Sequence, residues 1–89
     1  MDIRAKVAEV FIINMADVFM LDEEYITANP DLNFKEDLAA NSIKYFPLLA
    51  ALEDELGIEI SLHDFQNEGK TVSLGIDYVT WLYKKQKNM

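Results

Sequence analysis

Residues 41–57 read NSIKYFPLLAALEDELG, and no other stretch of the chain says as much about the fold. The stretch opens on Asn41 and Ser42, two residue types that cap the beginning of a helix. From Tyr45 to Leu52 almost every side chain is apolar, which is typical of a helix covered on most sides. Gly57 follows at the position where a helix commonly ends in a left-handed residue. The stretch therefore predicts a central helix over residues 42–56.

Pro47 lies inside this predicted helix. A proline there lacks the backbone N–H and crowds the preceding turn, which in a helix interior costs roughly 3 kcal/mol. The sequence therefore predicts either a bend at Pro47 or a late start of the helix near Phe46.

Before the central helix, Asp2 is expected to cap a first helix that runs to about Leu21, because apolar residues recur there at helical spacing. A long connection over residues 22–41 follows, and the NPD turn signal at residues 29–31 disfavours helix just before the proline. A connection of this length is unusual in a small domain and is often functional. We expect it to carry only short turns. Its apolar side chains should be pinned to the core: Leu32, Phe34 and Leu38.

After the central helix, residues 58–60 read IEI and fit a short strand or an extended link equally well. Ser61, with an acid three residues later, predicts a short third helix. Either Thr71 or Ser73 should cap the last helix. Because Gly75 weakens that helix by about 1 kcal/mol relative to Ala, we interpret it as a residue that allows close helix packing.

The predicted fold is all-α. We expect one domain over residues 1–89, a four-helix bundle with a short third helix and a long first loop. A chain of this length has room for one compact core and little for a deep, water-excluding active site. The sequence therefore disfavours an enzyme, and we expect no catalytic residues.

The charge and the cysteine count exclude several functions. Sixteen acidic residues against eight basic ones give a net charge of −8, which repels nucleic acid and favours partners with basic patches. The chain has no cysteine, so it has no disulfide, no cysteine-bound metal and no thiol of its own. His63 is the single histidine and no metal site is expected. We expect neither a signal peptide nor a membrane span, because the longest apolar run, residues 10–13, is too short.

Residues 37–43, DLAANSI, resemble the serine attachment site of acyl carrier proteins. The resemblance continues through residues 48–61, LLAALEDELGIEIS, and through residues 71–73 and 76–79 of the last helix. It covers about residues 30–83. The short serine motif alone would be a weak signal. The match over residues 48–61, at the distance from the serine that the family shows, makes the resemblance specific.

This resemblance implies a modified serine. In the family a phosphopantetheinyl transferase uses coenzyme A to attach 4′-phosphopantetheine to the serine, which here is Ser42, flanked by Asn41 and Ile43. The thiol of that group would supply what the cysteine-free chain lacks. A phosphodiester at the beginning of a helix also lies where backbone N–H groups favour an anion. From local sequence alone a plain N-cap is the favoured role of Ser42; the flanking resemblance favours the attachment site instead, and the two roles are compatible.

The resemblance also implies partners and a place for the acyl chain. It predicts docking of acyl-transferring, condensing or ligating enzymes with basic patches on Glu53, Asp54 and Glu55, with Lys44 near the serine. Family members can shelter an acyl chain between the central helix and the short one. The candidate lining residues are Phe46, Ala50, Ile58, Ile60, Phe65 and Val72. We expect a monomer in the cytoplasm.

The chain departs from the family pattern near the serine. Asn41 stands where the family usually has Asp, Ile43 replaces Leu, and the glycine expected at position 39 or 40 is Ala. Lys44 and Pro47 occupy positions where fatty-acid carriers usually have acids. These changes favour a specialised carrier of a lipid or polyketide-type pathway. Two alternatives stay open: an acidic helical interaction module that is never modified, and a carrier of an aminoacyl group such as D-alanine.

Overall fold

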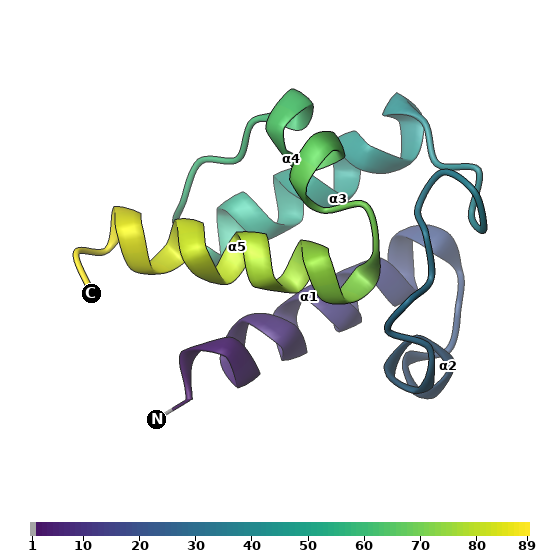
Figure 1. Cartoon of the computed structure of the whole chain (residues 1–89), viewed down its shortest axis with the longest axis horizontal. Coiled ribbons are helices and arrows are strands. Elements are labelled where there is room, and N and C mark those ends of the chain that lie inside the picture. Colours follow the sequence, from purple (N-terminus) through teal and green to yellow (C-terminus); the bar gives the residue numbers. More distant parts are fainter. Residues whose placement is uncertain (1) are drawn as a thin grey trace.

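The computed structural model describes residues 2–89, and within them the chain forms five helices (Figure 1). In chain order they are α1 (Ile3–Phe19), α2 (Glu23–Ala28), α3 (Ser42–Leu56), α4 (Leu62–Glu68) and α5 (Val72–Gln86). In this part of the chain there is no strand, only an isolated antiparallel bridge between Asn33 and Thr71. The predicted all-α bundle is confirmed, and residues 58–60 are an extended link rather than a strand.

The first connection differs from the prediction. It contains the six-residue helix α2, where only turns were expected. Asp22 precedes α2, and Glu23 and Glu24 in the first turn suit the positive end of a helix. Ile26 is fully buried and holds α2 against the rest of the molecule. A helix this short with one buried residue shows no periodic pattern, so tertiary packing decides its conformation.

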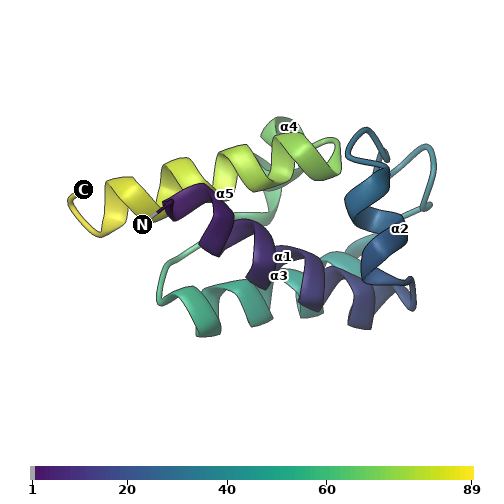
Figure 2. The ribbon, with the colours of Figure 1, turned by 90° about the horizontal axis from the view of Figure 1, so that it is seen from below.

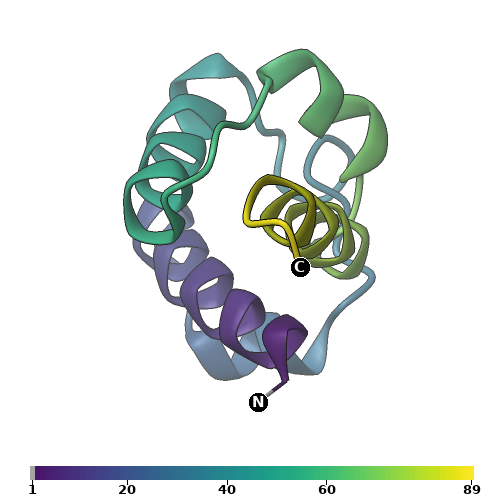
Figure 3. The same cartoon turned by 90° about the vertical axis from the view of Figure 1, so that its left-hand side faces the viewer.

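Helices α1, α3 and α5 form the body of the molecule, and α2 stands across one end of it (Figure 2). Seen along the body, α1 and α3 lie on one side and α4 and α5 on the other (Figure 3). α1 contacts both α3 and α5, and α4 contacts α5 and α3. None of the helices within residues 2–89 is long and apolar enough to cross a membrane.

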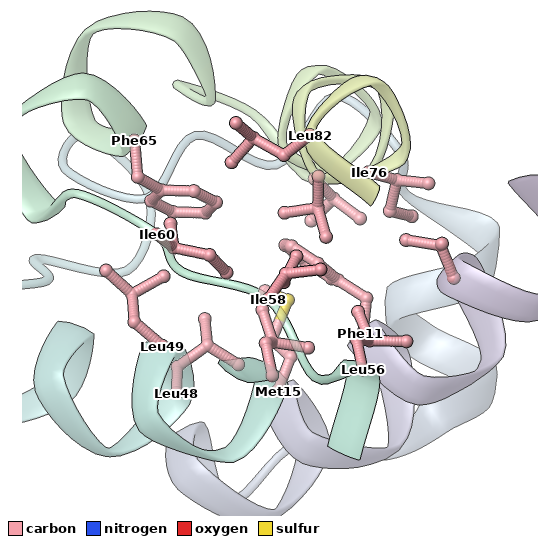
Figure 4. Close-up of a cluster of buried hydrophobic side chains, with 14 of the residues drawn as sticks. Phe11, Met15, Leu48, Leu49, Leu56, Ile58, Ile60, Phe65, Ile76 and Leu82 are labelled. Carbon is pink, nitrogen blue, oxygen red and sulfur yellow. The ribbon is translucent and has the colours of Figure 1, made fainter. Parts of the chain in front are cut away.

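The core lies between these helices, and its centre is aromatic. The rings of Phe11, Phe34, Tyr45 and Phe65 contact one another with centroids 5.7–6.2 Å apart. All four side chains are almost completely buried. Figure 4 shows two of these rings, Phe11 and Phe65, among aliphatic side chains that include Ile58 and Ile60 of the link between α3 and α4. Helices and loops therefore share one core.

The ends of α1 are set by local signals. The Asp2 carboxylate accepts the N–H groups of Arg4 and Ala5 at 3.0 and 3.3 Å, which confirms the predicted cap. The helix ends at Phe19, two residues before the predicted end, because Met20 adopts a left-handed conformation with φ of 57°. Such a residue turns the chain out of the helix.

The caps of the later helices follow the predictions. Gly57 ends α3 in the left-handed region, with φ of 65°. The Ser61 hydroxyl accepts the N–H of Asp64 at 3.4 Å at the start of α4. Of the two candidates for α5, Thr71 is the cap, and its hydroxyl accepts the N–H of Leu74 at 3.2 Å.

The predicted late start of the central helix is wrong. α3 begins at Ser42, five residues before Pro47, and continues past it to Leu56. The first turn is held from outside: Lys44 bonds to α1 and Tyr45 is buried in the aromatic centre. These contacts offset the missing hydrogen bond at the proline. The alternative, a bend at Pro47, stays a prediction.

Gly75 allows the close packing that the sequence indicates. A Cβ atom on this residue would lie 2.9 Å from Cζ of Phe11 and 3.3 Å from Cζ of Phe65. Real carbon contacts are longer, so a larger side chain here would push α5 away from α1.

Candidate functional site

Ser42 is the first residue of α3, and its side chain is exposed. The cap of the helix is Asn41, whose side-chain oxygen accepts the N–H of Ile43 at 3.0 Å. The Asn41 carbonyl accepts the N–H groups of Lys44 and Tyr45, both at 2.9 Å. The sequence left open whether Ser42 is itself the cap, and the structure gives that role to Asn41. The Ser42 hydroxyl is therefore available for chemistry.

The loop before Ser42 is held by its own hydrogen bonds. The Asn33 side-chain oxygen accepts the N–H groups of Lys35 and Glu36 at 2.9 Å, and the Asp37 carboxylate accepts the Asn33 N–H at 2.7 Å. Two backbone bonds then fix Phe34: its N–H donates to the Lys70 carbonyl at 3.0 Å, and its carbonyl accepts from Ala40 at 2.8 Å. A loop ordered by these hydrogen bonds thus positions the serine.

Ala39, three residues before Ser42, lies in the left-handed region with φ of 50°. This conformation costs a residue with a Cβ about 1–2 kcal/mol relative to glycine. Ala39 is one of the two positions where the family resemblance leads us to expect glycine. The backbone keeps the shape that glycine favours, although the side chain opposes it.

Lys44 has an internal partner. Its ammonium group donates to the carbonyl of Val18 at 3.2 Å, and its side chain is partly buried. The last carbonyls of a helix carry partial negative charge and attract a cation. Lys44 therefore joins the beginning of α3 to the end of α1. Its positive charge interacts with a carbonyl of the chain itself.

The three acids predicted for docking differ in their surroundings. Glu53 is partly buried, and its carboxylate accepts the N–H of Ile60 at 2.8 Å. The Glu55 carboxylate accepts a hydrogen bond from the Asn14 side chain on α1. Asp54 is exposed. Asp54 and Glu55 can meet a partner, whereas Glu53 stabilises the link after α3.

The predicted acyl-pocket residues divide into two groups. Ile58, Ile60, Phe65 and Val72 are buried in the core, at most 8% exposed. Phe46 is 58% exposed and Ala50 is also exposed, so both lie on the outer surface of α3. The structure therefore does not bring all six around one cavity.

Sequence reasoning missed the apolar character of the outer face of α3. Ile43 is 78% exposed, and Phe46, Pro47, Ala50 and Asp54 are exposed at helical spacing after it. The signal was present, because residues at i, i+3, i+4, i+7 and i+11 share one face of a helix. We define these five residues as the outer α3 face. It begins beside Ser42 and ends in an acid.

Two further titratable side chains, Tyr45 and His63, have different surroundings. Burial raises the pKa of the Tyr45 phenol above its ordinary value, so this side chain stays neutral in the core. His63 is exposed on α4, with Nε2 3.2 Å from the side-chain nitrogen of Asn67. Residues 2–89 contain no group of three or more His, Cys, Asp or Glu that could hold a metal ion.

An exposed serine hydroxyl at the first residue of the central helix of a small helical bundle fits the class of carrier domains. Comparison with known proteins identifies which family of carriers the chain resembles. Residues 9–79 match the family model described as a phosphopantetheine attachment site. The chain is 33% identical over 86 residues to an acyl carrier protein of Solidesulfovibrio magneticus, and the alignment covers 97% of both chains.

Two further similar proteins are also acyl carrier proteins. An acyl carrier protein of Lactobacillus acidophilus is 40% identical over 65 residues, which cover 73% of this chain and 78% of the relative. One from Nitratidesulfovibrio vulgaris is 43% identical over 51 residues, covering 57% of this chain and 66% of the relative. The chain belongs to the acyl carrier protein family. Its members are carriers rather than catalysts, they interact with phosphopantetheinyl transferases and acyl-handling enzymes, and they hold a covalent 4′-phosphopantetheine.

The beginning of α3 fits this prosthetic group. The Ser42 hydroxyl is exposed, and the cap is already supplied by Asn41. The positive end of the 15-residue helix α3 favours the phosphate that the hydroxyl would bear. The bound group supplies a thiol, which the chain itself lacks. The chain's own residues orient the serine and expose it.

Proposed function

We propose that Ser42 carries the 4′-phosphopantetheine and that the protein holds acyl groups on it as thioesters, for a specialised lipid or polyketide-type pathway. The observation that supports this most is the exposed Ser42 at the beginning of α3 with Asn41 as the helix cap. The hydroxyl is thereby released from a structural role, and its surroundings favour an anion.

The test is intact-mass spectrometry of the purified protein after incubation with coenzyme A and a broad-specificity phosphopantetheinyl transferase. We expect one phosphopantetheine per chain in the native sequence and none in Ser42→Ala. Ser73→Ala is the matched control, because Ser73 is the second residue of α5 and also lies near a helix start. Ser42→Ala that still gains the group, or a native chain that never does, contradicts the proposal.

The two alternatives predict other masses. An unmodified interaction module would stay at the mass of the bare chain after the same incubation. An aminoacyl carrier would gain the prosthetic group but would hold an amino acid such as D-alanine when purified from its source. Intact mass of the protein from its source therefore separates all three functions.

For docking, we propose the outer α3 face together with Glu55. Ile43 and Phe46 would supply apolar contact, and Asp54 and Glu55 would attract the basic patch of an acyl-handling enzyme. Lys44 and Glu53 would act mainly on the shape of this surface, since both have partners inside the molecule. Asp54→Lys should slow acyl transfer by a partner enzyme, whereas Glu24→Lys, an exposed acid on α2, should not.

The specialised role rests on Asn41, Lys44 and Pro47, which depart from the pattern of fatty-acid carriers. It predicts poor turnover of the loaded protein by a ketoacyl synthase of fatty-acid synthesis. Normal turnover by that enzyme would contradict it.

The acyl shelter also stays a proposal. An acyl chain between α3 and α4 would have to displace Ile60 and Phe65 from their packed positions, and Phe46 and Ala50 on the outer surface of α3 would line it only after a rearrangement. Amide shifts of these four residues on acylation would test it. The monomeric state and the cytoplasmic location remain predictions, and size-exclusion chromatography tests the first.

A further inference from the structure

A surface groove lies between α4 and α5, with a volume of about 570 Å³. Six residues line it: Asp64, Glu68, Leu74, Asp77, Tyr78 and Trp81. We call it the Trp81 groove. None of these residues belongs to the outer α3 face or to the loop that positions Ser42. In Figure 3, α4 and α5 are on the side of the molecule away from α1 and α3.

The floor of the groove is aromatic and rigid. Trp81 is 54% exposed and stacks on Tyr78, with centroids 6.0 Å apart and ring planes 24° from parallel. Tyr78 in turn contacts Phe65 of the aromatic centre, at 6.5 Å. Leu74, which also lines the groove, is 48% exposed. An exposed tryptophan backed by core aromatics is typical of an anchor point for a partner.

The rim of the groove is acidic. Asp64 and Glu68 lie one turn apart on α4, and within residues 2–89 no salt bridge neutralises either of them. Burial, and then the charges of these two acids, raise the pKa of the Tyr78 hydroxyl above its ordinary value. The third acid, Asp77, already binds Arg4 at 2.7 Å.

Two cations of the chain itself lie at the edges of the groove. Arg4 pairs with Asp77, and the Lys85 ammonium lies 4.7 Å from the centre of the Trp81 ring. They show which chemistry the surface accepts: a cation beside a carboxylate, and a cation over an aromatic face. Asp64 and Glu68 offer further positions for the same chemistry.

We propose that the Trp81 groove docks a basic amphipathic helix of a partner protein, whose apolar side chains cover Trp81 and Leu74 and whose Arg or Lys side chains pair with Asp64 and Glu68. This rests on charge complementarity and on the exposed aromatic floor, and it goes beyond the proposed function at Ser42. A second copy of the chain is disfavoured because each copy carries a net charge of −8. A small organic cation is disfavoured because Tyr78 and Trp81 stack on each other and do not enclose a space.

The position of the groove has a consequence for a carrier. The groove is lined by residues of α4 and α5, so it shares no residue with Ser42 or with the outer α3 face. The carrier could stay attached to one partner while successive enzymes act on its cargo.

Trp81 is the only tryptophan of the chain, so its fluorescence reports on the groove directly. The probe is a synthetic helical peptide of about 15 residues with Leu and Arg on one face. We expect saturable binding to the full chain with a change in Trp81 emission. A peptide of the same composition without a helical face, and spermine as a small cation, are the controls, and both should bind more weakly.

The decisive comparison uses two double variants of equal charge. Asp64→Asn with Glu68→Gln removes the rim acids, and we expect about tenfold weaker binding. Glu23→Gln with Glu24→Gln removes two exposed acids of α2, and we expect a change below about twofold. Both variants keep Trp81 as the reporter.

Equal weakening in the two double variants would overturn the proposal, because the peptide would then respond only to net charge. Equal binding of spermine, or of the peptide without a helical face, would overturn it as well. Loading of Ser42, measured by mass, should be the same in both double variants, so this test fails or succeeds independently of the proposed carrier function.

Discussion

The carboxyl end of α3 and its amino end are stabilised by contacts of different range. At the carboxyl end, Gly57 turns the chain and Glu53 binds the N–H of Ile60, two local contacts, and Glu55 adds one distant hydrogen bond from Asn14 of α1. At the amino end, Lys44 reaches Val18, and the loop before Ser42 is held through Phe34 by Lys70. The amino end, where Ser42 lies, therefore depends more on contacts distant in sequence, whereas the turn after the carboxyl end is fixed mainly by local residues.

The largest test of this difference is Phe34→Ala, which removes the fully buried anchor of the loop before Ser42. Loss of its ring contacts should lower the free energy of unfolding by about 4 kcal/mol. Phe46→Ala is the matched control and should change it by less than about 0.5 kcal/mol, because Phe46 is exposed. Urea unfolding measures the free energy of unfolding of both variants. Equal losses would show that Phe34 anchors the loop no more strongly than the exposed Phe46 does.

Glu53→Ala tests the carboxyl end. The variant leaves the N–H of Ile60, a residue that is 8% exposed, without its acceptor, so we expect a loss of about 2 kcal/mol. Glu53→Gln keeps an acceptor oxygen and should retain most of the stability. Asp54→Ala, next to it and exposed, should cost little. If Asp54→Ala proved as harmful as Glu53→Ala, helix propensity or net charge would be the cause rather than the hydrogen bond.

Ala39→Gly sharpens the comparison at the amino end. Glycine relieves the left-handed strain at φ of 50°, and the expected gain in stability is about 1 kcal/mol, reduced by the greater freedom of glycine in the unfolded chain. Thermal unfolding measures the effect. Ala40→Gly, one residue later, is the control and should not stabilise, since Ala40 does not have a positive φ. A gain in both variants would point to the unfolded state.

The smallest expected effect is that of Asn41→Asp. The carboxylate keeps the cap to the N–H of Ile43 and adds a negative charge at the start of α3, which should stabilise by about 0.5 kcal/mol. Raising the salt concentration should reduce the gain, because the charge is exposed. Asn41→Ala should instead cost about 1 kcal/mol. A gain that does not respond to salt would exclude the helix dipole as its cause.

These pairs also show what could be predicted from the sequence. The end of α3, the role of Gly57 and the cap Asp2 follow from residues that are neighbours along the chain, whereas the choice of Thr71 over Ser73 as the cap of α5 needed the structure. Local patterns of this kind determine local geometry.

Phe34 and Phe46 illustrate what could not be predicted. Both are phenylalanines, yet Phe34, between two polar residues in sequence, is fully buried, whereas Phe46, in an apolar run, is 58% exposed. Only packing against distant helices separates them. The same holds for Glu53 and Asp54, adjacent acids of which one bonds inside the molecule, and for α2, which a single buried isoleucine keeps in place. Family resemblance located Ser42, but the role of Asn41 as the actual cap needed the structure.

The contact between Phe11 and Gly75 allows the packing of α1 against α5 to be followed in solution. The Phe11 ring lies against the backbone of Gly75, where an added carbon would be 2.9 Å from Cζ. Circulating electrons in an aromatic ring displace the magnetic resonance of nuclei held close to it, so the α-protons of Gly75 should have an unusual chemical shift. Any event that separates α1 from α5, such as acyl loading or partner capture, would move that signal toward its ordinary position.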